Sequence, residues 1–200
     1  MKLPDQIRKL TSILAELPSI GPRQAQRLVF YLISLGPNSI HMFAEGIESL
    51  RSIKVCERCF FIHVNPEMLC DICSSKTRRQ DIIMIVEKET DFMSIENTGK
   101  YVGRYLVLGP LMKTGLLDDV QKLRIESLKS FVQKELGGQA EEIILGLNPT
   151  GVGDMNASIL GRELALLAKK ISRLGRGLPT GGDIEFADDS TLGNALEGRF

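Results

Sequence analysis

The chain has 200 residues, of which 43% are hydrophobic and 25% charged, a composition typical of a folded chain rather than a disordered one. Its 25 basic and 25 acidic side chains give a formal net charge of zero, which excludes a strongly basic nucleic-acid-binding domain. The charge is uneven, because residues 1–80 carry 11 Lys and Arg against 7 Asp and Glu, whereas residues 181–200 carry 1 against 5. The length fits one or two domains.

The first 53 residues predict three helices. Apolar side chains recur at helical spacing over residues 5–17, and residues 18–22, which contain Pro and Gly, interrupt the pattern. A second helix is expected to begin at Pro22, since proline suits the first helical position. A third helix is expected over about residues 39–53.

The turn between the first two helices has features that favour phosphate binding. Gly21 and Pro22 belong to a tight turn, and the N-terminus of the following helix presents backbone N–H groups to an anion. Arg23 and Arg27 are spaced i and i+4, so both project from one helix face beside the turn. The segment resembles the helix-hairpin-helix motif, which binds DNA backbones without reading sequence, although Ser19 stands where that motif usually has its first glycine. An ordinary structural hairpin is the alternative.

All four cysteines form two C-x-x-C pairs, Cys56 with Cys59 and Cys70 with Cys73. Two such pairs are typical of a tetrahedral zinc site, and four thiolates close the coordination shell, so the metal is expected to be structural. His63 lies between the pairs and is expected to be a surface residue rather than a ligand. Five basic residues near the pairs either offset the thiolate charge or contact phosphate: Lys54, Arg58, Lys76, Arg78 and Arg79.

The second half of the chain alternates predicted strands and helices. Short apolar runs predict strands over residues 82–86, 105–108 and 143–145. Helices are expected between and after them, at about residues 90–97, 118–136 and 155–170. This alternation is typical of a mostly parallel α/β sheet, whose ligands bind at the carboxyl ends of the strands.

Acidic and glycine-rich residues follow two of these strands. Glu87 follows the first strand directly, and residues 146–154 form a glycine-rich loop that ends in Asp154. The arrangement resembles a Toprim domain, in which a glutamate and a later D-x-D pair hold Mg²⁺. The first position of that pair is Val152 here, so the sequence argues against a Mg²⁺ site. The glycines are expected to form a tight strand-to-helix turn instead, and no G-x-x-x-x-G-K-[ST] loop supports ATP hydrolysis.

The sequence therefore predicts an α+β chain of four modules. These are a helical helix-hairpin-helix domain at residues 1–53, a four-Cys zinc finger at 54–79, a Toprim-like domain with a mostly parallel sheet at 80–176 and a C-terminal tail at 177–200. The order of the modules, and several local strings, resemble the RecR family of bacterial recombination mediators over nearly the whole chain. The strings are Leu17-Pro-x-Ile-Gly-Pro, Ala25-Gln-Arg27, Cys70-x-Ile-Cys73, Asn148-Pro-Thr150, Leu178-Pro-x-Gly-Gly-Asp183 and Thr191-Leu-x-x-Ala-Leu-Glu-Gly-Arg199.

The resemblance implies a non-catalytic, sequence-independent DNA clamp in recombinational DNA repair. Members of the family assemble into rings, commonly homotetramers, and act with RecO and RecF to load RecA onto single-stranded DNA coated by SSB. By position, Arg23, Arg27 and Gly21 match DNA-contacting residues. A second group matches the Toprim face linked with partner binding: Glu87, Asn148, Thr150 and Asp154.

Two other functions compete with this interpretation. The chain could be a protein-interaction scaffold in which the zinc finger and the tail bind partners, or a Mg²⁺-dependent nuclease or topoisomerase-like enzyme using Glu87 and Asp154. Val152 counts against the enzyme. No apolar run is long enough to span a bilayer and no signal peptide opens the chain, so we expect a cytoplasmic, nucleoid-associated protein without membrane contact.

Overall fold

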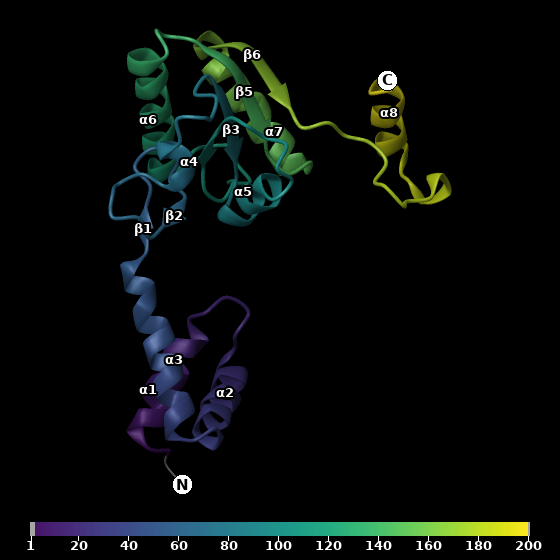
Figure 1. Ribbon diagram of the computed structural model, residues 1–200. Coiled ribbons are helices and arrows are strands. Elements are labelled where there is room, and N and C mark those ends of the chain that lie inside the picture. The colour runs from purple at the N-terminus through teal and green to yellow at the C-terminus, as the bar shows by residue number, and fades with distance from the viewer. Residues whose placement is uncertain (1–2, 200) are drawn as a thin grey trace. The chain divides into compact units, whose positions relative to one another are not determined.

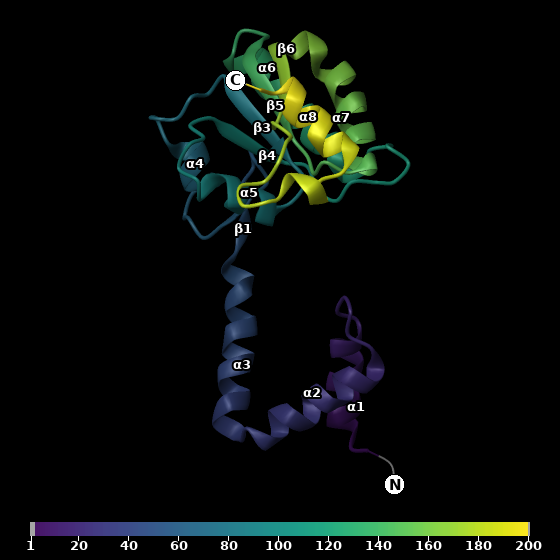
Figure 2. The same cartoon turned by 90° about the vertical axis from the view of Figure 1, so that its right-hand side faces the viewer.

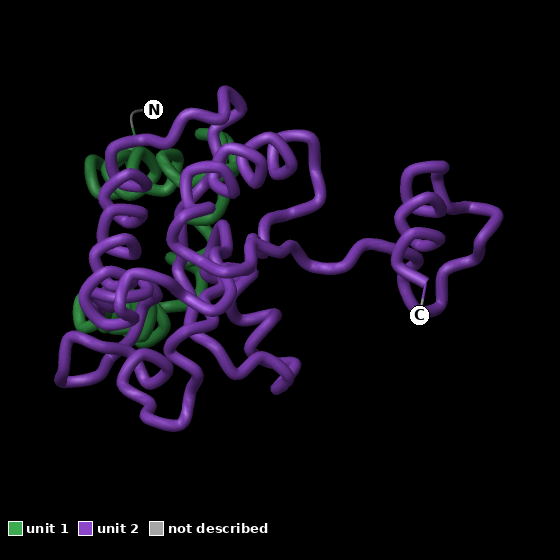
Figure 3. Tube along the Cα trace, turned by 90° about the horizontal axis from the view of Figure 1, so that it is seen from above, with its two compact units in different colours: residues 1–53 green, residues 54–200 purple. Residues whose placement is uncertain are grey.

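The structure, a computed structural model, describes residues 3–199. It divides into two compact units, residues 1–53 and residues 54–200, which are coloured separately in Figure 3. The finer division of the second unit into a finger, a Toprim-like domain and a tail stays a prediction.

The first unit is helical (Figure 1). Its α1 packs on α2, and Ala25 and Val29 of α2 are buried between them. Two of the helices begin with proline, whose fixed φ suits the first helical position, and Gly36 precedes the third with a φ of 84°. The helices are α1 (Asp5–Ala15), α2 (Pro22–Ser34) and α3 (Pro37–Ser49), followed by a 3-10 turn at Leu50–Ser52.

The second unit contains a four-stranded parallel sheet in the order β4-β3-β5-β6. Each strand is joined to the next by a helix, as parallel strands require. The strands are β3 (Ile82–Val86), β4 (Arg104–Val107), β5 (Ala140–Gly146) and β6 (Ala168–Arg173). The connecting helices are α5 (Glu89–Glu96), α6 (Asp119–Glu135) and α7 (Gly151–Leu164), the last continuing into a 3-10 turn at Ala165–Leu167.

The two faces of the sheet bury different side chains, because successive strand residues point to opposite sides. Ile83 and Ile85 of β3 belong to the larger core, which α6 and α7 cover. Met84 and Val86 belong to a smaller core, which Phe92 of α5 covers. Figure 2 shows the sheet between these helices. Helices on both faces explain why β3 reads as an uninterrupted apolar run.

Two short segments, one before the sheet and one after it, complete the second unit. Before the sheet lie an antiparallel hairpin of β1 (Lys54–Val55) and β2 (Ile62–His63), and the single-turn α4 (Asp71–Ser74). After the sheet, the predicted tail contains a 3-10 turn at Ile184–Phe186 and α8 (Asp189–Glu197). Asp188 caps α8 by accepting from the backbone N–H of Thr191 at 2.9 Å.

The predicted α+β class with a parallel sheet is confirmed, but one element is wrong. The sequence predicts a helix over residues 155–170, whereas α7 begins at Gly151 and ends at Leu164, and residues 168–173 form the edge strand β6. The glycine-rich residues 146–154 do form the expected turn from β5 into α7. Within residues 3–199, the structure has no helix that is both long and apolar enough to cross a membrane.

Candidate functional site

The four cysteines form one buried cluster. All four are at most 4% exposed, and their sulfur atoms lie within 4.8 Å of one another. The Sγ atoms of Cys59 and Cys70 are 3.4 Å apart, too far for a disulfide and close to the separation of about 3.8 Å that two thiolates have on one tetrahedral zinc ion. Among the described residues, this is the one group of three or more side chains that could hold a metal ion.

Local backbone geometry presents the first pair of thiols. In the β1–β2 hairpin, the Cys56 N–H donates to the Phe61 carbonyl oxygen at 2.8 Å, and the Phe60 N–H donates to the Cys56 carbonyl oxygen at 2.9 Å. Phe60 adopts a positive φ of 61°, which turns the chain sharply after Cys59. The N–H of Cys70 points at the sulfur of Cys56, 3.4 Å away, a contact that favours a thiolate.

The cluster cannot carry four negative charges without a cation. Hydrogen bonds among the thiols lower the pKa of Cys56 and raise the pKa of Cys59, so the protons are shared unequally across the group. Burial by itself pushes the pKa of both thiols upward, because a thiolate loses its hydration there, although the hydrogen bonds outweigh this effect at Cys56. A divalent cation bound by all four sulfurs would stabilise four buried thiolates, because its positive charge offsets theirs.

The cluster is attached to the parallel sheet. The backbone N–H of Val107 in β4 donates to the Cys59 carbonyl oxygen at 2.8 Å, and the Arg104 guanidinium donates to the Cys73 carbonyl at 2.9 Å. Phe61 stacks on Phe92 of α5 with ring centroids 4.0 Å apart. The finger therefore covers one edge of the sheet and shares its smaller core.

The basic residues around the cysteines mostly have partners of their own. Arg58 pairs with Glu135, Arg78 with Glu96 and Arg79 with Asp81. Lys54 donates to the Pro66 carbonyl at 2.7 Å. These contacts stabilise the finger and its junction with the sheet, and they leave little positive charge free to contact phosphate.

His63 is half-buried rather than a surface residue. Its Nδ1 accepts from the backbone N–H of Asn65 at 3.2 Å. The cluster of possible metal ligands contains the four cysteines and not this histidine, as the cysteine spacing predicts.

The helical hairpin has the geometry of a tight, open turn. The N–H of Ile20 donates to the Leu17 carbonyl at 3.1 Å, and Gly21 precedes α2 in an extended conformation with ψ 164°. Ser19 has a φ of 65°, a left-handed conformation that normally favours glycine. The backbone therefore keeps a turn that favours glycine, although serine occupies the position.

Arg23 and Arg27 lie on the exposed side of α2. Both are exposed, whereas Ala25 and Val29, offset from them by two residues along the same helix, are buried. Two residues correspond to about 200° around a helix, so the arginines point away from the buried face. Gly21 has no side chain that could cap α2, which leaves N–H groups of the first turn available next to the arginines.

Two residues of the predicted partner face are brought together at the end of β3. The Glu87 carboxylate accepts from the Asn148 side-chain N–H at 3.0 Å and from the Leu111 backbone N–H at 3.3 Å. Thr150 instead caps α7, accepting from the Gly153 N–H at 3.1 Å. Glu87 and Asn148 thus form one polar pair, while Thr150 acts locally on the helix.

Asp154 is held by two arginines that no sequence motif singles out. Its carboxylate accepts from Arg173 at 2.6 Å and from both terminal nitrogens of Arg176. Hydrogen bonds from Arg176, and to a smaller extent from Arg173, lower the pKa of Asp154 to about 2. A carboxylate engaged by two guanidinium groups is a poor ligand for Mg²⁺. The sequence does not predict this contact, because it assigns part of the segment 168–173 to a helix.

Comparisons with known proteins agree with this arrangement. A family model described as Toprim domain matches residues 81–175, and one described as RecR, C-terminal matches residues 177–199. A protein named Recombination protein RecR from Chloroflexus aggregans is 40% identical over 196 residues, which cover 96% of this chain and 92% of the relative. The chain belongs to the RecR family.

Relatives in other bacteria give the same result. Recombination protein RecR from Roseiflexus castenholzii is 37% identical over 200 residues, covering 98% of this chain and 94% of that protein. The protein of that name from Gloeobacter violaceus is 36% identical over 196 residues, 96% of each chain. The Toprim match spans the parallel sheet, and the RecR C-terminal match spans α8, so the family resemblance extends over the whole second half of the chain.

Proposed function

We propose that this RecR-family chain is a non-catalytic DNA clamp in recombinational DNA repair. It would bind DNA through the hairpin of the first unit and help RecO and RecF to load RecA onto single-stranded DNA coated by SSB. The observation that carries the proposal is the exposed pair Arg23 and Arg27 on α2, beside the tight turn at Gly21. Arginines and open N–H groups at a helix N-terminus bind phosphate without reading bases.

Self-assembly would supply the charge that one chain lacks. The formal net charge is zero, so one chain offers few phosphate contacts. In a ring-shaped homo-oligomer, with a tetramer as our proposal, the arginine pair of every copy would face the same DNA. An apolar face of α3 and the 3-10 turn after it supports association, because four apolar side chains there are 52–71% exposed: Met42, Phe43 and Ile47 of α3 and Leu50 of the turn.

We assign zinc to the four-cysteine cluster. Buried sulfur ligands in two C-x-x-C pairs suit Zn²⁺, and four protein ligands leave no open position for substrate. The role of the metal would be to fix the finger on β4, through the contacts of Cys59 and Cys73. The formal net charge counts the four cysteines as neutral. Four thiolates with one Zn²⁺ would therefore lower the net charge of the chain by about two units.

The contacts of Asp154 support a non-catalytic Toprim domain. Val152 offers no oxygen ligand, and Asp154 already pairs with Arg173 and Arg176. Glu87 is bound to Asn148, so we propose that this edge of the domain recognises a protein partner such as RecO rather than Mg²⁺. A Toprim nuclease would need a free set of carboxylates.

The clamp proposal is tested by DNA binding across a salt titration. The double variant Arg23→Ala and Arg27→Ala should weaken binding and flatten the slope of log affinity against log salt by about one unit for each phosphate that is no longer neutralised. The matched control removes the same charge from α1 of the same unit, as Arg8→Ala and Lys9→Ala. Binding is measured by fluorescence anisotropy, and assembly by sedimentation.

The two double variants separate the proposed contact from bulk charge. We expect the Arg23 and Arg27 variant to bind DNA at least tenfold more weakly, while the affinity of the α1 variant falls much less. Equal reductions in both variants would contradict a specific role for the hairpin. Mg²⁺-dependent DNA cleavage that disappears in Glu87→Gln would support the alternative function, a Mg²⁺-dependent nuclease or topoisomerase-like enzyme.

A further inference from the structure

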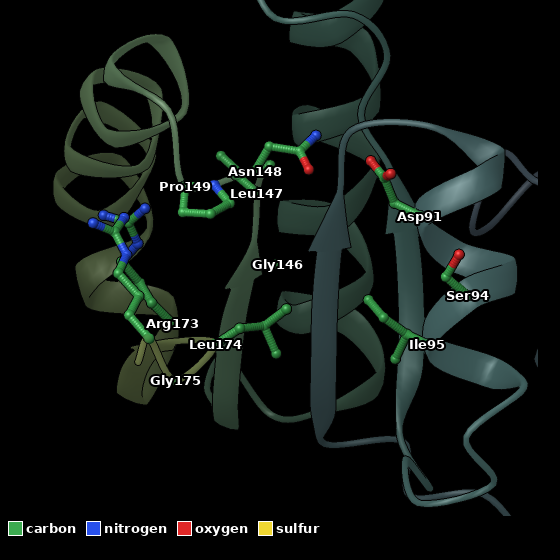
Figure 4. Close-up of a pocket in the computed structure, with 11 residues that line it drawn as sticks. Asp91, Ser94, Ile95, Gly146, Leu147, Asn148, Pro149, Arg173, Leu174 and Gly175 are labelled. Carbon is green, nitrogen blue, oxygen red and sulfur yellow. The ribbon is translucent and has the colours of Figure 1, made fainter. Parts of the chain in front are cut away.

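A pocket of about 270 Å³ opens at the carboxyl end of the parallel sheet (Figure 4). Figure 4 shows residues of α5 on one side of it and residues at and after the end of β6 on the other, with the end of β5 between them. Its size is near the lower end of the range for small-molecule sites, about 300 Å³. Its lining includes Asp91 and Ile95 of α5, Leu147 and Pro149 after β5, and Arg173 and Arg176 at and after the end of β6.

The sheet topology independently places a ligand site here. From β3 the chain runs to β4 on one side and later returns to β5 on the other side of β3. The strand order therefore reverses between β3 and β5, and open parallel sheets bind ligands at the carboxyl ends of the strands where that reversal occurs. The pocket lies at this position, lined by the residues that follow β5.

One wall of the pocket is positively charged. Arg173 and Arg176 share the single carboxylate of Asp154, so the group keeps a net positive charge. Their contacts with Asp154 use Nη2 of Arg173 and the two Nη atoms of Arg176. Each guanidinium has five N–H donors, which leaves donors for an anionic group in the pocket.

The opposite wall holds a carboxylate that needs a donor. Oδ2 of Asp91 is buried and has no hydrogen-bond partner among the described residues. Loss of hydration raises the pKa of Asp91, although Lys88 nearby lowers it and Glu87 raises it. A buried carboxylate oxygen without a donor is unfavourable, and a ligand N–H that reaches the Asp91 carboxylate from the pocket would supply a donor to this group.

Between these walls the lining is mostly apolar, with Ser94 and Asn148 as its polar side chains. Ile95, Leu147 and Leu174 contribute side chains, and Pro149 contributes a flat ring. A compound that suits the pocket has an anionic end, an aromatic or apolar body and an N–H donor at the far end. An amino acid has the two charged ends but little body between them, whereas a mononucleotide has all three parts.

We propose that this pocket binds a nucleoside monophosphate, with the phosphate on Arg173 and Arg176 and an N–H group of the base on Asp91. The site is separate from the cysteine cluster and from the hairpin. The inference does not depend on the clamp function, because none of its residues belongs to the first unit.

Calorimetric titration of the full chain with adenosine monophosphate tests the proposal. We expect one ligand per chain, and at least tenfold weaker binding of adenosine and of inorganic phosphate, each of which occupies only one end of the pocket. Glycine tests the amino-acid alternative in the same assay. No saturable binding of the nucleotide up to about 10 mM, or glycine binding more tightly than the nucleotide, would overturn the proposal.

Two variants examine the two walls. Asp91→Asn should weaken nucleotide binding about tenfold and leave phosphate binding unchanged. Arg173→Gln should weaken nucleotide and phosphate binding alike and leave adenosine binding unchanged. Lys169→Gln is the matched control, because Lys169 is an exposed cation of the same strand with its own partner, Glu141. Unchanged nucleotide affinity in both wall variants would contradict the assignment.

A gain-of-function variant keeps the test decisive if Arg173→Gln does not fold. Asp154→Asn frees both guanidinium groups from their carboxylate, so phosphate and nucleotide should bind several-fold more tightly than to the wild-type chain. Weaker binding would count against the arginine wall. DNA affinity measured in the same variants should equal that of the wild-type chain, which separates this result from the fate of the clamp proposal.

Discussion

Single residues show how the acidic side chains of this Toprim domain are engaged by other protein groups. Glu87 remains at the end of β3, but its two oxygens accept from Asn148 and Leu111. Asp154 remains at the start of α7, but two arginines neutralise it. Both acidic residues therefore make structural contacts, and we expect their removal to affect stability.

The ion pairs of Asp154 should make stability depend on acid pH. The arginines lower its pKa from 3.8 to about 2, so its stabilising contribution is complete above pH 4 and disappears as the pH falls toward 2. The side chain is 42% exposed, so we expect a contribution below about 1 kcal/mol. The difference in Tm between the wild-type chain and Asp154→Asn should shrink over that interval. A difference that stays constant from pH 6 to 2 would contradict this origin.

Gly153 should be irreplaceable at the start of α7. A Cβ added there would lie 1.9 Å from the Asn148 carbonyl oxygen, so Gly153→Ala must displace backbone. We expect the free energy of unfolding, measured with urea, to fall by about 1–3 kcal/mol. Gly151→Ala is the control, since a Cβ at Gly151 has no heavy atom within 4 Å. That change should be neutral or slightly stabilising, because alanine favours helix over glycine.

At the scale of elements, the cysteine finger and the parallel sheet belong to one compact unit. Val107 and Arg104 of β4 donate to carbonyl groups of the finger. Burial lowers the pKa of Arg104, and its Nε has no partner among the described residues. Unfolding of the finger would leave this buried cation with still fewer partners, which is costly.

Metal removal should therefore loosen the sheet as well as the finger. A chelator is expected to lower Tm by at least about 10 °C and to change the near-UV circular dichroism of Tyr101 and Tyr105. The chain has no Trp, so tyrosines that contact each other and Phe92 report on the smaller core. Cys70→Ser should reproduce the effect and Ser74→Ala should not. An intact tyrosine signal after complete metal removal would show that the sheet folds independently.

The predictability of these elements follows their burial. Residues 82–86 are predicted without error because both faces of β3 are covered, which produces a continuous apolar run. Edge strand β6 is not predicted, because Lys169 and Lys170 face solvent and interrupt any such run. The cysteine cluster could be predicted from spacing alone, whereas the wall of Arg173 and Arg176 could not, since its position depends on that edge strand.

For the whole molecule, assembly should depend on the apolar face of α3. Phe43 is 52% exposed, and Phe43→Glu would place a charge in the proposed contact between copies. We expect a lower mass by sedimentation and at least tenfold weaker DNA binding, because fewer arginine pairs would converge. Helix content should stay unchanged by circular dichroism.

The control for Phe43→Glu adds the same charge on another side of α3. His41 is exposed and contacts Glu45, so it lies on the polar side of the helix. His41→Glu should leave mass and DNA affinity close to those of the wild-type chain. A ring that persists in Phe43→Glu would show that copies associate through a different surface.

The edges of the sheet decide how copies can join. The finger covers β4. The other edge strand, β6, carries Lys169 and Lys170, which form ion pairs with Glu141 and Glu142 of β5. Charged or covered edge strands resist the strand-to-strand pairing that leads to open-ended polymers. In the proposed ring, copies would therefore join through helices, in contacts that can close after a fixed number of subunits. In the proposed assembly, the four-cysteine finger would therefore help to limit the number of copies, because it covers β4.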